Sequence, residues 1–200
     1  TEMLFTSGTT GTSKCVALSE KNILAAVNAA CESVDCSPED SIVSVLPIHH
    51  TYELCIMLAG LNYGMNIAIN DSLKRVLKNF ALFAPTGLVL VPLFVSTMNK
   101  RIWDEARKGG KEKALRLLIK LSRGLRALHI DLRKVFFSQI TSAFGGRLEK
   151  IVCGGAPLNP ELAETFSEFG IDISEGYGIT ECAPLIAVNP YFAPKKGSVG

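Results

Sequence analysis

The alternation of short apolar segments with longer amphipathic segments is the feature that most constrains the fold. The apolar segments are continuous, which is typical of strands buried on both faces of a parallel sheet. Their alternation with helical segments predicts an α/β fold, in which a mostly parallel β-sheet is flanked by helices. We expect strands at 3–5, 15–18, 41–46, 65–69, 88–91, 148–153 and 171–174.

Capping residues set the expected helix boundaries. Ser19 suits the N-cap of a helix that runs to about Val34, and Asn159 followed by Pro160 begins a helix that Gly170 ends. The remaining helices are expected from Thr51 to Gly64, from Ser72, and through a long region after residue 91 that breaks near 109–110 and again near 124–130.

Length and cysteine usage bound the class of protein. The 200 residues are enough for one domain with a sizeable core, and no repeat or linker divides them. No apolar run approaches the roughly 20 residues of a membrane span, and the chain begins without a secretory signal. The six cysteines form no C-x-x-C pair, so we expect reduced thiols in a cytoplasmic protein, not a disulfide framework or a zinc site.

Charge is distributed unevenly along the chain. Residues 100–134 carry 12 Lys or Arg and 4 Asp or Glu, whereas the remainder carries 9 basic and 15 acidic residues. Lys113, Arg116, Lys120 and Arg123 fall on one face at helical spacing. A solvated helix face is the plainest interpretation; peripheral docking on an anionic membrane and contact with the phosphates of coenzyme A are alternatives. No nucleic-acid partner is expected.

The segment "FTSGTTGTSK" at 5–14 combines six hydroxyl side chains, two glycines and a lysine. Hydroxyls and bare backbone N–H groups are donors, and glycine lets the main chain approach a ligand closely. Such a loop suits phosphate oxygens and predicts a nucleoside triphosphate ligand. It is not a Walker A loop, which needs Gly-Lys-Ser/Thr followed by a helix. For such a loop taken alone, a flexible turn is the alternative.

Three further segments follow predicted strands, at 47–53, 154–157 and 175–181. In open parallel sheets, ligands bind beyond the carboxyl ends of the strands. We therefore expect the chemistry of the protein to lie in these three loops.

Four motifs carry a family resemblance. They are "FTSGTTGTSK", "LPIHH" at 46–50, "GGAPL" at 154–158 and "YGITE" at 177–181. In this order they resemble the phosphate loop, the Leu-Pro-x-x-His element, the adenine-side segment and the Thr-Glu segment of the adenylate-forming superfamily, which includes acyl-CoA synthetases, luciferases and peptide-synthetase adenylation domains. The intervening stretches "HTYE", "WDEARKGGKEKAL", "DLRKVFF" and "FGGRLEKIVCGGAPLNPELAETF" resemble its long-chain fatty-acyl-CoA synthetase branch. The resemblance covers essentially the whole chain.

The resemblance implies a ligase that works in two steps. A fatty-acid carboxylate attacks the α-phosphate of ATP and gives acyl-AMP and pyrophosphate, and the thiol of CoA then displaces AMP. Charge builds on phosphate oxygens in the first step, so positioned donors and Mg²⁺ are expected to dominate catalysis.

Roles for individual residues follow from the same motifs. Thr180 is expected to contact the α-phosphate, Glu181 to bind Mg²⁺ and Tyr177 to stack on adenine. His50 corresponds to the histidine near the acyl carboxylate and the CoA path. The other expected binding residues are Thr6, Ser7, Gly8, Thr9 (also a metal ligand), Thr10, Gly11 and Lys14 around the phosphates and Gly155, Ala156, Pro157, Glu175, Gly176 and Gly178 around the nucleotide. The plainer alternatives are a surface lysine for Lys14, a helix N-terminal acid for Glu181, core packing for Tyr177 and a structural role for His50.

The chain departs from the family pattern in two ways. Ser13-Lys14-Cys15 stands where the family usually has Pro-Lys-Gly, and Cys15 takes positive φ less readily than glycine. The later Tyr-x-Thr-Gly-Asp segment is missing from the 200 residues. We therefore expect residues 1–200 to be the central part of an N-terminal AMP-binding domain, without the C-terminal domain and inactive alone. Alternatives are another adenylate-forming ligase, acting on an aryl or amino acid, and a nucleotide-binding module without turnover.

Overall fold

A twisted sheet organises the chain in the computed structural model, which describes residues 1–7 and 11–200. Within these residues the sheet has six strands in the order β4-β3-β5-β6-β7-β8. Neighbours from β4 to β7 are parallel, and β7 and β8 are antiparallel. The predicted α/β fold with a mostly parallel sheet is therefore confirmed. The strand bounds are Ser41–Ser44 (β3), Asn66–Ile69 (β4), Gly87–Leu90 (β5), Lys150–Cys153 (β6), Asp172–Gly178 (β7) and Leu185–Val188 (β8).

A separate hairpin precedes the sheet. The sequence predicts its two strands, β1 (Glu2–Ser7) and β2 (Ser13–Leu18); they are antiparallel, and Thr6 lies opposite Lys14. Cys15 lies opposite Phe5 in extended backbone and is not among the residues with positive φ. The substitution of cysteine for the usual family glycine therefore imposes no left-handed strain at this position.

The helices follow the predicted capping residues closely, with one exception at the start of α2. Ser19 caps the first helix, where its side chain and that of Asn22 form a reciprocal capping box. His50 is the N-cap of the second helix, so Thr51 is its first residue and not its cap. The helix bounds are Glu20–Val34 (α1), Thr51–Asn62 (α2), Val76–Phe83 (α3), Pro92–Lys108 (α4), Glu112–Ala127 (α5), Arg133–Phe136 (α6), Ser138–Ser142 (α7) and Pro160–Glu168 (α8).

The second expected break, near 124–130, lies between α5, which ends at Ala127, and α6, which begins at Arg133. Gly124 itself lies inside α5. A glycine inside a helix costs only about 1 kcal/mol relative to alanine. Burial of Leu115 against Phe137 and Phe169 on the inner face of the helix offsets that cost.

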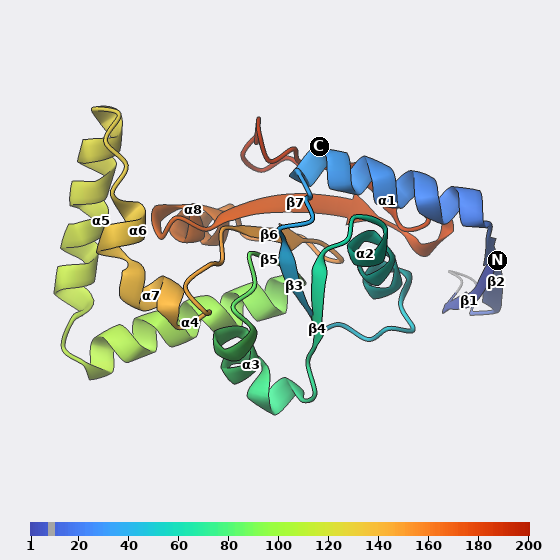
Figure 1. Ribbon diagram of the computed structural model, residues 1–200, viewed down its shortest axis with the longest axis horizontal. Coiled ribbons are helices and arrows are strands. Elements are labelled where there is room, and N and C mark those ends of the chain that lie inside the picture. The colour runs from blue at the N-terminus through green and yellow to red at the C-terminus, as the bar shows by residue number, and fades with distance from the viewer. Residues whose placement is uncertain (8–10) are drawn as a thin grey trace.

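The two faces of the sheet are packed differently. One face carries the main core, in which Phe80, Met98 and Phe166 from α3, α4 and α8 pack on Leu90 and Ile151. The opposite face meets α1 and α2, which form a second cluster that reaches the hairpin through Leu18. A third cluster joins α5 to Phe137 and Phe169. Figure 1 shows α5 at one end of the elongated molecule and the β1–β2 hairpin at the other.

Candidate active site at the strand ends

A cavity of about 610 Å³ lies beyond the carboxyl ends of β3, β6 and β7, where the predicted loops meet. Its wall includes His50 and Thr180, which are 130 positions apart in the chain. The predicted site residues on it are His50, Gly155, Gly176, Tyr177, Gly178 and Thr180. The sequence therefore identified the region of the cavity, although the structure holds no ligand that tests the individual roles.

Gly178 shapes the β7 side of the cavity. A Cβ atom on Gly178 would lie 1.9 Å from the carbonyl oxygen of Pro184, so only glycine permits the close approach of the β7–β8 hairpin. The backbone N–H of Ile179 then donates to the same carbonyl at 2.9 Å. This close backbone contact holds Thr180 on the cavity wall, at the start of the short 3₁₀ turn Thr180–Cys182.

The adjacent glycine pair after β6 admits a neighbouring side chain. A Cβ atom on Gly154 would lie 3.1 Å from both the Tyr52 hydroxyl and the carbonyl oxygen of Gly176. Gly155 takes a φ of +83°, which favours glycine. Gly155 therefore lets the backbone turn after β6, and the Tyr52 hydroxyl occupies the space that a side chain on Gly154 would fill.

Tyr177 lies on the cavity wall with 52% of its surface exposed. That exposure argues against core packing as its role. The flat, open face of a tyrosine suits stacking on a planar ring, and adenine stacking stays a prediction.

The remaining nucleotide-side residues lie outside the cavity wall. Ala156, Pro157 and Glu181 are exposed, and Glu175 is partly buried at the end of β7. Burial raises the pKa of the Glu175 carboxyl. The assignment of these four residues to nucleotide or metal binding is not tested by the structure.

The predicted phosphate loop is only partly described. Gly8, Thr9 and Thr10 lie outside the described residues, while Gly11 takes a φ of +80° and Lys14 is exposed on β2. Strand β2 packs beside the Thr180–Cys182 turn, and Leu18 shares a buried cluster with Ala183. The strand that follows the loop and the Thr-Glu segment are thus neighbours. The roles predicted for Thr6, Ser7, Gly11 and Lys14 stay predictions.

A magnesium ion fits this region only with ligands from a substrate. Among the described residues no group of three or more His, Cys, Asp or Glu side chains is placed to hold a metal. Glu181 offers one exposed carboxylate in the turn beside the hairpin. Mg²⁺ often takes one or two carboxylates and completes its shell with water and phosphate oxygens. One protein carboxylate is therefore compatible with Mg²⁺ arriving together with a nucleotide.

His50 stands at the N-terminus of α2, and its side chain is exposed to the cavity. The His49 ring packs against it at a tilt, with 4.5 Å between ring centroids. His50 is thus positioned beside the cavity mouth, and its role in acyl or CoA binding stays a prediction.

The sequence did not indicate the importance of Glu53, which lies in the first turn of α2. Its side chain is 1% exposed, and it accepts hydrogen bonds from the Ser44 hydroxyl and from the backbone N–H groups of Val45 and Leu46. Burial raises the pKa of this carboxyl above its usual range, although those hydrogen bonds oppose the rise. Glu53 therefore ties the end of β3 to the helix that carries His50. The available signal was an acidic residue in the first turn of a helix that follows a buried strand.

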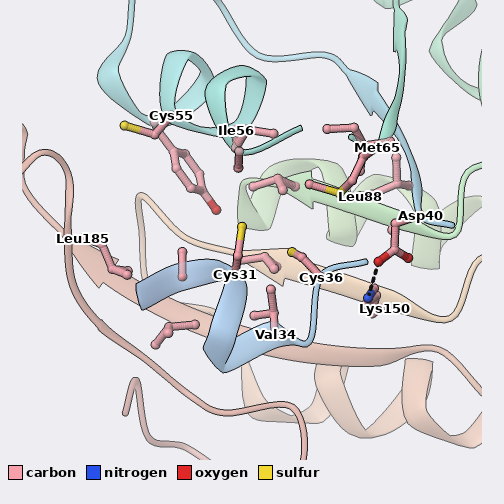
Figure 2. Close-up of a pocket in the computed structure, with 18 of the residues that line it drawn as sticks. Cys31, Val34, Cys36, Asp40, Cys55, Ile56, Met65, Leu88, Lys150 and Leu185 are labelled. Atoms are coloured by element: carbon pink, nitrogen blue, oxygen red, sulfur yellow. Dashed lines mark hydrogen bonds and ion pairs between the residues drawn. The ribbon is translucent and has the colours of Figure 1, made fainter. Parts of the chain in front are cut away.

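Tyr52 separates the cavity from a second, apolar pocket. Its hydroxyl is buried, without a hydrogen-bond partner among the described residues, and burial raises the pKa of this phenol. The second pocket has a volume of about 120 Å³ and lies between α1, α2 and the sheet (Figure 2). Tyr52, Val152, Pro184 and Leu185 line both spaces. An apolar chamber therefore adjoins the candidate active site directly.

The basic residues of α5 are exposed as predicted, but three of them, Arg116, Arg123 and Arg126, have acidic partners. Arg116 pairs with Glu112 and lies over the Trp103 ring, 4.7 Å from its centroid. Arg123 donates to Glu168 at 2.7 Å. Helix α5 lies at the end of the molecule opposite the hairpin (Figure 1), and contact of its cations with the phosphates of coenzyme A stays a prediction.

No helix in the described part of the chain is both long and apolar enough to cross a membrane.

Comparison with known proteins gives a consistent family. The model of the family described as "AMP-binding enzyme" matches residues 2–200. A long-chain-fatty-acid–CoA ligase of Mycobacterium bovis is 26% identical over 99% of the chain. The peroxisomal long chain acyl-CoA synthetase 6 of Arabidopsis thaliana is 32% identical over 92% of it, and human long-chain-fatty-acid–CoA ligase 1 is 30% identical over 89%. The chain spans 36%, 27% and 27% of the lengths of these three relatives.

Solved structures support the fold. ATP-bound MatB from Rhodopseudomonas palustris superposes with a TM-score of 0.67 at 24% identity, covering 99% of this chain and 33% of its own. Escherichia coli MenE with bound OSB-AMS superposes with a TM-score of 0.64 at 22% identity, covering 99% of this chain and 34% of its own. At these identities the likeness concerns the fold of the adenylate-forming N-terminal domain alone.

Proposed function

The chain belongs to the AMP-binding enzyme family, and on that basis we propose that the intact protein activates a long-chain fatty acid with ATP and transfers the acyl group to CoA. The matched relatives that carry long-chain fatty-acid ligase names favour this substrate class. The activity is that of the whole protein, because the chain spans about a third of those relatives.

The observation that carries the proposal is the apolar pocket beside the strand-end cavity. Its lining is almost wholly hydrocarbon, with Ala26, Val34 and Ile56 from the two helices facing Val89 of the sheet. A chain that entered past Tyr52 would leave its carboxylate in the strand-end cavity near Thr180. Transfer of methylene groups from water into such a pocket is favourable by about 0.8 kcal/mol each. A fatty acid satisfies both parts of this divided space.

Each predicted group has a defined task in the proposed reaction. Lys14 and the loop hydroxyls would bind the β- and γ-phosphates, and Thr180 would orient the α-phosphate toward the carboxylate. Glu181 would hold Mg²⁺, which supplies neutralisation of phosphate charge when bound. Tyr177 would stack on the adenine, and His50 would lie between the acyl carboxylate and the CoA path.

Another acid is the main alternative within the family. The fold neighbours MenE and MatB have different names from the long-chain ligases, so the fold leaves an aryl or other short acid possible. The apolar pocket favours the fatty acid, because a short or polar acid would leave it unfilled. A nucleotide-binding module without turnover is the alternative from another class. ATP–pyrophosphate exchange by the intact protein with palmitate, with benzoate and with no acid separates the three.

Glu181→Gln tests the metal assignment. A neutral amide is a poorer ligand for Mg²⁺, so we expect a higher Mg²⁺ requirement and a loss of about 10²–10³ in turnover. Glu39→Gln, at another exposed glutamate, is the matched control and should leave both unchanged. Unaltered Mg²⁺ dependence in Glu181→Gln would return this residue to a structural role.

A cytoplasmic location with peripheral membrane contact through α5 is also proposed, without support from the comparisons. Lys113 and Lys120 are exposed on that helix, and anionic surfaces attract such cations within a Debye length. Sedimentation of the intact protein with anionic vesicles at low salt tests this contact.

A further inference from the structure

Two cysteines meet at the end of α1. Cys31 is in the last turn of the helix and is 2% exposed, and Cys36 follows the left-handed residue Asp35. The chain reversal at Asp35 lets the backbone N–H of Cys36 donate to the carbonyl oxygen of Cys31 at 3.0 Å. The side chains of both cysteines line the apolar pocket (Figure 2).

The surroundings make the two thiols unequal. Cys36 is partly exposed, and the ammonium of Lys150 lies nearby, anchored by Asp40 at 2.9 Å and by the carbonyl oxygen of Asp35 at 2.7 Å. The neighbouring Cys31 thiol, followed by the charge of Lys150, lowers the pKa of the Cys36 thiol, against burial and the carboxylates of Asp40 and Asp35. The neighbouring Cys36 thiol and burial raise the pKa of Cys31.

The other described cysteines lack this arrangement. Burial raises the pKa of Cys55 to about 11 and that of Cys153 to about 12, so both stay protonated at neutral pH. Cys15 and Cys182 are exposed, and neither has a thiol partner among the described residues. A thiolate nucleophile is favoured by a nearby cation and by access to solvent. Cys36 is the cysteine that meets both conditions, and a second cysteine, Cys31, lies on the wall of the same pocket with its carbonyl oxygen bonded to the Cys36 N–H.

We propose that Cys31 and Cys36 form a site of reversible oxidation by hydroperoxides, at which Cys36 reacts first and Cys31 closes an intramolecular disulfide. In the first step the Cys36 thiolate attacks one peroxide oxygen. An S–O bond forms, the O–O bond breaks, and the departing oxygen takes up a proton and leaves as water or alcohol. The sulfur is oxidised to a sulfenic acid and the peroxide is reduced.

In the second step the Cys31 sulfur attacks the Cys36 sulfur. The S–S bond forms, the S–O bond breaks, and the hydroxide leaves as water with the proton of the Cys31 thiol. A thiol reductant restores both cysteines by exchange. The disulfide would fasten the end of α1 to the turn that leads to Asp40, in the wall of the apolar pocket.

Mass spectrometry tests the site without any measurement of enzymatic activity. The reduced protein is treated with hydrogen peroxide, its remaining thiols are alkylated, and it is digested with a glutamate-specific protease. Cleavage after Glu32 separates Cys31 from Cys36, and cleavage after Glu39 and Glu53 separates both from Cys55. Peptides 21–32 and 33–39 should therefore stay joined after peroxide treatment and separate after reduction.

Single variants distinguish the two roles. Cys31→Ser should accumulate a sulfenic acid at Cys36, which dimedone captures, whereas Cys36→Ser should react at least tenfold more slowly at Cys31. Cys182→Ser, at an exposed thiol, is the control and should form the 31–36 disulfide at the wild-type rate. Oxidation of Cys15 or Cys182 while both Cys31 and Cys36 remain alkylatable would overturn the proposal, and so would equal dimedone capture in the two variants.

Discussion

A single buried carboxyl, that of Glu53, fixes the turn that leads into the candidate active site. Three donors converge on it, from Ser44, Val45 and Leu46, so the strand end and α2 are joined through one side chain. An amide in its place keeps one acceptor oxygen but presents its own N–H groups to the same donors. Leaving a buried donor without an acceptor costs about 1–3 kcal/mol.

Glu53→Gln should therefore lower the free energy of unfolding by about 1–3 kcal/mol near pH 5. Because burial raises the pKa of Glu53, the folded protein holds this proton more tightly than the unfolded chain does. As pH rises above the ordinary value of 4.5, the wild type loses stability relative to the variant, until Glu53 also ionises in the folded protein. Denaturant unfolding between pH 5 and 8 should show that the difference in unfolding free energy between the wild type and Glu53→Gln becomes smaller as pH rises.

Glu32→Gln supplies the control, since Glu32 is exposed on α1. Its unfolding free energy should differ from that of the wild type by less than about 0.5 kcal/mol at every pH. If the difference in unfolding free energy between the wild type and Glu53→Gln instead grew as pH rose, burial would not raise the pKa of Glu53.

Residue positions around the cavity were predictable where a motif fixes them. His50 and Thr180 line the cavity because each follows a strand end, which is visible in the sequence, whereas Tyr177 lies within β7, which runs four residues beyond its expected end at 174. The burial of Glu53 was not predictable, because its three donors come from backbone and hydroxyl groups nine to seven positions earlier in the chain. The hydroxyl of Tyr52 was missed for the same reason, since its surroundings are assembled from α2, β6 and β7.

At the scale of elements, α5 is held to the domain partly by charge. Glu168 at the end of α8 has a side chain that is 11% exposed, and Arg123 and Arg126 of α5 lie at 2.7 Å and 3.7 Å from its two oxygens. Sequence periodicity placed Arg123 on a solvated face, which its exposure confirms, but its partner lies 45 residues away and has no signature in the sequence. Reversal of charge at Arg123 is therefore not the silent change expected of an exposed face.

Arg123→Glu should lower the free energy of unfolding by about 1–2 kcal/mol. This is below the 3–5 kcal/mol of a fully buried pair, because Arg123 is itself 59% exposed and solvent screens the interaction. Lys120→Glu, one turn earlier on the same helix, should change the unfolding free energy by about 0.5 kcal/mol or less. Equal losses in the two variants would show that net charge, and not the contact with Glu168, determines the effect.

The elements themselves were largely predictable, and the errors have physical causes. Ser19, Asn159 and Pro160 mark helix starts because they satisfy or remove orphan N–H groups locally. Strand β8 was missed because it is a four-residue, partly exposed strand that pairs antiparallel with β7 after a close backbone crossing. The helix break expected near 124–130 begins after Ala127, so Gly124 stays helical at a cost of about 1 kcal/mol that tertiary packing of α5 offsets.

At the scale of the whole molecule, the fold gathers the predicted motifs at one edge of the sheet but supplies only some of the groups that adenylation needs. The hairpin, the Thr180–Cys182 turn and the cavity lie in neighbouring positions. The Tyr-x-Thr-Gly-Asp segment of related enzymes, whose aspartate holds the ribose, is not among the 200 residues. The chain also spans only 27–36% of the relatives it matches, so most of each relative has no counterpart in it.

We therefore predict that the 200-residue chain alone forms no acyl-CoA. Loss of one preorganised electrostatic contributor commonly reduces turnover by about 10²–10³. Two contributors are missing from the chain, the ribose aspartate and the catalytic lysine that the family resemblance places in a C-terminal domain, so the combined loss brings turnover below detection. The measurement is thioester formation from palmitate, MgATP and CoA, with the intact protein as the positive control and a cooperative thermal melt to show that the chain is folded. Turnover by the folded chain within tenfold of the intact protein would mean that the groups gathered at the strand ends suffice, and that the missing segments serve another purpose.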